Sequence, residues 1–109
     1  MLKFKEGVSI FGLQPEILWA IDRATEVFAQ FGRDCVVTSA RGDVHSRKSR
    51  HYSGLAVDLR IRHLGNPQAV ADGLAQKIGE AFDVVLESTH IHVEYDPKTA
   101  PKYLTRMAS

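Results

Sequence analysis

The sequence has one cysteine, no long apolar run and almost no net charge, and each of these absences excludes a class of protein. Cys35 has no partner for an internal disulfide and lies in an apolar run, which indicates a buried thiol. No apolar segment is long enough for the core of a signal peptide or for a membrane span. A formal net charge of +1 argues against a surface that coats nucleic acid and against an acidic tail. We therefore expect a soluble globular protein that is made in the cytoplasm.

The chain of 109 residues is long enough for one domain with a single core. Helical spacing of apolar residues predicts a helix over 15–31 and a second, weaker one over 67–82. Short β-branched or alternating runs predict strands near 7–11, at 35–39, at 55–61, and over 83–88 and 90–95 as two strands or one kinked strand. The order β-α-β-loop-β-α-β-β predicts an α+β domain over 1–109, in which two helices cover a small, mostly antiparallel sheet. We expect an irregular tail from about residue 97.

Four of the five histidines lie in the basic loop after residue 40 or in the segment HIHVEY. In HIHVEY, the alternation of a strand places His90, His92 and Glu94 on one face. The same alternation in LAVDLRI places Asp58 on the face opposite to the apolar residues. If the two strands are neighbours, one carboxylate and two imidazoles meet in a single patch, and His51 of the loop can fold over it.

Histidine and aspartate side chains in such a patch form a suitable ligand set for zinc, with the fourth position left to water. A divalent cation would keep Asp58 ionised among apolar neighbours, where an unpaired carboxylate is costly. Two other interpretations remain open from the residues alone. The histidines can be ordinary polar surface, and Asp58 can pair with Arg41 or Arg60. The sequence has no HExxH and no CxxC, which excludes the common helix-borne and zinc-ribbon sites.

Residues 49–58, SRHYSGLAVD, fill every fixed position of the pattern SxHxxGxAxD. This resembles the signature of the zinc D-alanyl-D-alanine carboxypeptidases and dipeptidases of peptidoglycan, a family that includes phage endolysins. The segment ESTHIH is similar to the closing acid and histidine segment of that family. The wider stretch from residue 37 to the end of ESTHIH at residue 92 also resembles the signalling domain of hedgehog proteins, which shares the fold and the zinc site. Together the two resemblances cover roughly residues 35–95. The resemblance implies that the domain has the fold shared by the hedgehog signalling domain and the D-alanyl-D-alanine peptidases.

For the metal, the resemblance implies zinc held by His51, Asp58 and His92. We choose His92 because family members often present the ligand as the second histidine of an HxH pair, or followed by x-Glu. Some relatives place the catalytic acid three residues before the ligand, which here would pair Glu87 with His90 instead. The third ligand is therefore His92 or His90.

For catalysis, the resemblance implies metal-assisted amide hydrolysis, in which zinc activates water and polarises the scissile carbonyl. Glu87 would take the water proton and return it to the leaving amine. His90 would hydrogen-bond the oxyanion or orient the base. Arg41 would bind a substrate carboxylate, for which a guanidinium is suited, and Ser49 would hydrogen-bond the substrate or cap the loop.

These implications predict a zinc peptidase that cuts peptidoglycan stem peptides or cross-links, as a monomeric phage or prophage lytic enzyme. It would be made in the cytoplasm without a signal peptide and act at the bacterial cell wall after release, with no specific nucleic-acid or membrane partner. One alternative is a zinc-containing, hedgehog-like binding module without turnover. Another is a DNA-nicking nuclease that uses the HIH triplet and Tyr103, although this leaves the pattern at 49–58 unexplained.

Overall fold

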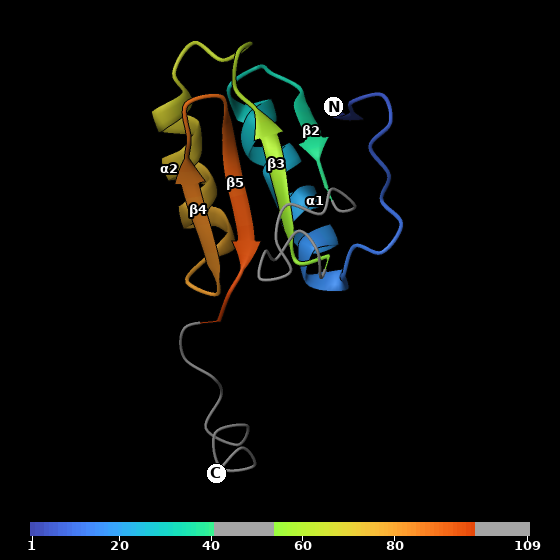
Figure 1. Ribbon diagram of the computed structural model, residues 1–109. Coiled ribbons are helices and arrows are strands. Elements are labelled where there is room, and N and C mark those ends of the chain that lie inside the picture. Colours follow the sequence, from blue (N-terminus) through green and yellow to red (C-terminus); the bar gives the residue numbers. More distant parts are fainter. Residues whose placement is uncertain (41–53, 98–109) are drawn as a thin grey trace.

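The computed structural model describes residues 1–40 and 54–97, which form a small α+β domain with two helices and a five-stranded mixed sheet (Figure 1). The predicted order of elements is confirmed. The elements are β1 (Leu2–Phe4), α1 (Pro15–Gln30), β2 (Cys35–Ser39), β3 (Ala56–Arg60), α2 (Pro67–Ile78), β4 (Phe82–Leu86) and β5 (His90–Tyr95).

The strands lie in the order β1-β2-β3-β5-β4, so that β3 is the central strand. β1 pairs with β2 in parallel, and the other three pairings are antiparallel, which confirms a mostly antiparallel sheet. Both helices lie behind the sheet on the same side in Figure 1. One face of the sheet is thus packed against helices, and the other is available for polar side chains.

The core lies between the helices and the covered face of the sheet. As the alternation predicted, Val57 and Leu59 of β3 are buried there, and they are paired across the sheet with Val93 and Ile91 of β5. Burial of each such side chain stabilises the fold by about 1.5–3 kcal/mol relative to exposure. Cys35 is also completely buried, as predicted, and burial raises the pKa of its thiol to about 12. No helix in the described part of the chain is long and apolar enough to span a membrane.

The helix starts agree with the sequence, but the end of the second helix was predicted wrongly. α1 begins at Pro15, and α2 begins at Pro67 after Asn66, whose side chain accepts a hydrogen bond from the Ala69 amide. α2 ends at Ile78 rather than near residue 82. Gly79 follows with a φ of 84° and a ψ of −174°, a non-helical conformation open to glycine that ends the helix before β4 begins.

The first predicted strand is misplaced, whereas the prediction of two separate strands over 83–95 is confirmed. The first strand is Leu2–Phe4 and not residues 7–11, because Gly7 adopts a φ of 87° and the chain turns there. The segment predicted over 83–88 is a separate strand, β4, which begins at Phe82 and ends at Leu86. The predicted tail lies outside the described residues from position 98 onward.

Gly54 lies where the chain enters β3 and passes against the segment that precedes α1. Its carbonyl accepts a hydrogen bond from the Gln14 amide, with an N···O distance of 2.9 Å. Its φ is 77°, and a β-carbon at this position would lie 2.0 Å from the Gly12 carbonyl oxygen. A glycine is required here both by the backbone conformation and by the close approach of two backbones.

Candidate metal centre

The strands β3 and β5 are neighbours, which is the condition on which the predicted patch depended. In their antiparallel register, Asp58 is directly opposite His92, and Arg60 is directly opposite His90. Since directly opposed residues point to the same side of a sheet, Asp58, His90 and His92 all lie on the face away from the helices. The central strand and its neighbour thus bring three of the predicted site residues together.

The side chains of these residues are in contact. His92 Nδ1 lies 2.9 Å from Asp58 Oδ1, and His90 Nε2 lies 3.5 Å from the same oxygen. The other ring nitrogen of His92, Nε2, is 3.1 Å from Glu94 Oε1. Among the described residues, the side chain of Asp58 contacts the imidazoles of His90 and His92, and no ion pair joins it to Arg60.

The two carboxylates change the titration of His92. Its side chain is only 21% exposed, and its pKa is raised from 6.5 to about 9. The main cause is the hydrogen bond to Asp58; burial opposes it, and the second hydrogen bond, to Glu94, adds to the rise. At neutral pH and without a metal, both ring N–H groups of His92 therefore donate to carboxylates.

This pKa shift predicts how the stability of the metal-free protein depends on pH. Because the folded-state pKa lies above the unfolded value, His92 stabilises the fold fully below about pH 6.5, and this contribution is lost as the pH rises through about 9. In the presence of a chelator, the urea midpoint of the protein should exceed that of His92→Gln by more at pH 6 than at pH 9.5. Equal differences at the two pH values would contradict the assigned contacts.

The contacts of His92 fit a zinc ligand. Imidazole and carboxylate are zinc donors, and with metal–ligand bonds of ~2.0–2.1 Å two tetrahedral ligand atoms lie about 3.3 Å apart. His92 Nδ1 and Asp58 Oδ1 are near this separation. A histidine that binds zinc usually donates its other ring N–H to a carboxylate, and Glu94 is placed to accept it. The loop histidine of the predicted ligand set, His51, lies outside the described residues.

The other predicted site residues are not part of this cluster of side chains. Glu87 lies in the turn between β4 and β5, where its backbone N–H donates to the His90 carbonyl at 2.8 Å. Its exposed side chain forms no hydrogen bond or ion pair with any described residue, so its role as the base stays a prediction. Arg41 and Ser49 lie outside the described residues, as does Tyr103 of the alternative nuclease site.

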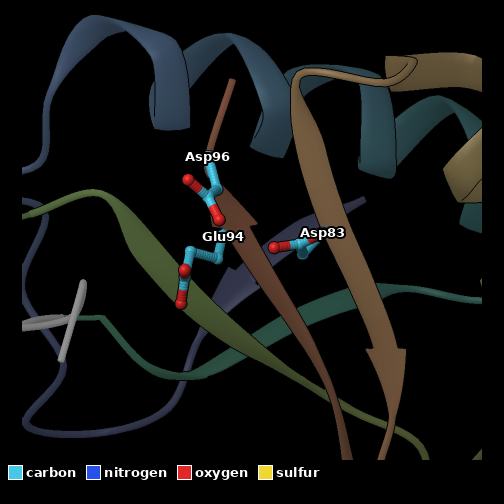
Figure 2. Close-up of side chains that lie close together, drawn as sticks. All are labelled: Asp83, Glu94 and Asp96. Carbon is cyan, nitrogen blue, oxygen red and sulfur yellow. The ribbon is translucent and has the colours of Figure 1, made fainter. Parts of the chain in front are cut away.

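Glu94 was assigned no role from the sequence, although the strand alternation had placed it on the correct face. It also belongs to an acidic group with Asp83 of β4 and Asp96, which follows β5 (Figure 2). One ligand atom of each of these three residues lies within 4.8 Å of the others. Such a group can hold a cation, but acidic clusters of this kind are also common without one. The signal that could have revealed it is the pairing of Asp83 with Glu94 across β4 and β5, which the sequence alone does not specify.

Comparison with protein-family models, with curated proteins and with solved structures finds no match to this chain.

Proposed function

We propose that this protein is a zinc-dependent peptidase that hydrolyses amide bonds in the stem peptides or cross-links of peptidoglycan. The observation that carries the proposal is the set of contacts from Asp58 to His92 and from His92 to Glu94, on the face of the sheet away from the helices. In it, a carboxylate contacts one ring nitrogen of His92 while a second carboxylate fixes the other. Asp58 is also the last residue of the pattern SxHxxGxAxD, which resembles the signature of the zinc D-alanyl-D-alanine peptidases.

In this proposal, Asp58 and His92 would hold zinc together with His51 from the loop before β3. When bound, the metal supplies Lewis-acid activation of water and of the scissile carbonyl. Glu94 holds the orientation of His92, so that Nδ1 faces Asp58, and with zinc at Nδ1 it would accept the one remaining ring N–H, on Nε2. A positioned imidazole needs no reorganisation during the reaction, and this is why a supporting carboxylate matters for rate as well as for affinity.

We assign proton transfer and stabilisation of the oxyanion to residues that lie beside the proposed zinc ligands. His90 lies 3.5 Å from Asp58 and is partly exposed, which suits a group that hydrogen-bonds the oxyanion or orients the base. Glu87 is our candidate for the base, because its turn is joined to the backbone of His90 and its carboxylate is accessible. Arg41 and Ser49 remain our candidates for binding the substrate.

The finer parts of the proposal rest on the resemblance. We infer that the domain has the fold of the hedgehog and D-alanyl-D-alanine peptidase group, with the sheet and helices described above as its common frame. We also infer a monomeric lytic enzyme of phage or prophage type that is made in the cytoplasm and acts at the bacterial cell wall after release. A hedgehog-like binding module without turnover is the alternative that shares the same ligand set.

The test is digestion of purified peptidoglycan by the zinc-loaded protein, with mass analysis of the released fragments. We expect new amino groups and cleaved stem fragments, their loss on addition of a chelator, and their return when zinc is added back. Binding of zinc and of wall fragments without release of amines would favour the binding module. No chelator-sensitive release from any wall type would refute the peptidase.

A further inference from the structure

A pocket of about 290 Å³ opens on the same face of the sheet, next to His90. It is lined by Lys5, Thr38, Arg60, Arg62, Thr89 and His90, and we call it the basic pocket. The Lys5 backbone is held to β2 by a hydrogen bond from its N–H to the Val37 carbonyl, 2.9 Å long. Arg60 is part of β3, so the backbones of both Lys5 and Arg60 are held by hydrogen bonds to the sheet.

Among the described residues, the cations of the basic pocket have no carboxylate partners. In residues 1–40 and 54–97, Lys5, Arg60 and Arg62 form no ion pair, and the Nε of Arg60 is buried without a hydrogen-bond partner. Other surface cations are paired, for example Lys3 with Asp34 and Lys77 with Glu26. Like charges gathered around a hollow repel one another, and a buried donor without a partner is costly, so an anion in the pocket would relieve both effects.

The position of the pocket relates it to the candidate metal centre. The opposed pair Arg60 and His90 lies two residues along the strands from the opposed pair Asp58 and His92. This separation is about 6.6 Å. A peptide advances at most about 3.6 Å per residue. An anion in the basic pocket would therefore belong to a group one or two residues from the bond at the metal.

We propose that the basic pocket is a subsite for a free carboxylate of the stem peptide, and that it makes the enzyme selective for acidic stems over amidated ones. This inference rests on the proposed function. Stem peptides carry free carboxylates, and guanidinium groups bind carboxylates through paired, charge-assisted hydrogen bonds. Thr38 and Thr89 also line the pocket; the Thr38 hydroxyl donates to the Asp58 carbonyl, and the Thr89 hydroxyl contacts His90 Nδ1. Amidation removes the negative charge but keeps the shape of the peptide, so the charge of the pocket alone discriminates between the two substrates.

The test compares a stem peptide with free carboxyl groups and the same peptide with those groups amidated. For the double variant Arg60→Gln/Arg62→Gln, we expect KM to rise roughly tenfold or more on the free-carboxylate stem, with kcat nearly unchanged. On the amidated stem, the variant and the wild type should be alike. The control Lys3→Gln/Lys77→Gln removes the same charge elsewhere and should behave as wild type. An equal KM for variant and control on the free stem would overturn the subsite while leaving the peptidase intact.

A binding measurement keeps the inference testable if no hydrolysis is found. Zinc-loaded protein labelled with ¹⁵N is titrated with each stem, and the signals of the Arg60 Nε–H and the Thr89 amide are followed. Saturable shifts with the free stem that are absent with the amidated stem and in the double variant support the subsite. Shifts that are absent, or equal for both stems, overturn it. If the double variant does not fold, Arg62→Gln replaces it, because that side chain is exposed.

Discussion

Replacing Asp58 by asparagine or His92 by glutamine should abolish zinc binding and lower hydrolysis of peptidoglycan by at least about a thousandfold. A catalytic metal contributes several kcal/mol to the barrier, and each 1.36 kcal/mol is a factor of ten in rate. Asp58→Asn keeps the shape of the side chain and removes its charge, so a loss of zinc would come from the donor and not from packing. Zinc content after dialysis, together with initial rates on purified walls, measures both effects.

Matched variants separate ligands from supporting residues. Glu94→Gln should keep zinc but weaken its affinity by about 10–100-fold, as is typical when a carboxylate that orients a ligand histidine is removed.

His90→Gln should retain zinc and slow hydrolysis, whereas a loss of zinc in this variant would make His90 the ligand in place of His92. Glu87→Gln should retain zinc and lose activity if Glu87 is the base. If Asp58→Asn still binds zinc as tightly as the wild type, the proposed metal centre is wrong.

Gly54→Ala should be the most destabilising small substitution in the described part of the chain. Its β-carbon would lie 2.0 Å from the Gly12 carbonyl oxygen, which is backbone and cannot move aside as a flexible side chain could. Left-handed backbone adds about 1–2 kcal/mol for a residue other than glycine. Together these effects should cost more than about 4 kcal/mol, a size that only a few mechanisms reach. Urea denaturation, or failure to obtain folded protein, measures the result.

Two other glycines serve as controls that separate the steric contact with Gly12 from the cost of the backbone conformation. Gly79 also has a positive φ, 84°, with a ψ of −174°, but nothing lies within 4 Å of a β-carbon there, so Gly79→Ala should cost only the conformational term of about 1–3 kcal/mol. Gly65 has neither feature, and Gly65→Ala should change the free energy of unfolding by less than about 0.5 kcal/mol. Equal effects at Gly54 and Gly79 would show that the contact with Gly12 relaxes freely.

The close approach at Gly54 also explains part of the pattern SxHxxGxAxD. Gly54 is needed by the backbone, and Ala56 is completely buried directly opposite Glu94 of β5. Asp58 is the polar member of these three, and its side chain is 17% exposed. The described half of the pattern therefore consists of two residues that shape the start of β3 and one residue that faces the imidazoles.

Local patterns predicted much of this fold because they depend on neighbours in the chain. Proline and the residues around it mark where both helices start, and β-branched composition predicted β2 at its observed bounds, Cys35–Ser39. The extent of α2 was overestimated because its apolar spacing continues past Gly79, while the positive φ and extended ψ of that glycine end the helix. The first strand was misplaced because three residues are too few for a clear pattern, and β1 depends on its pairing with β2.

The sequence by itself determined which side chains share a face: the two-residue period of a strand places His90, His92 and Glu94 together and sets Asp58 opposite to the apolar residues of β3. Only the tertiary structure decided that β5, and not β4, lies beside β3, and that the register sets Asp58 against His92 and Arg60 against His90. The physical reason is range. Alternation follows from the geometry of a single strand, whereas strand order and register follow from the packing of both helices on the whole sheet, which unites residues more than thirty positions apart.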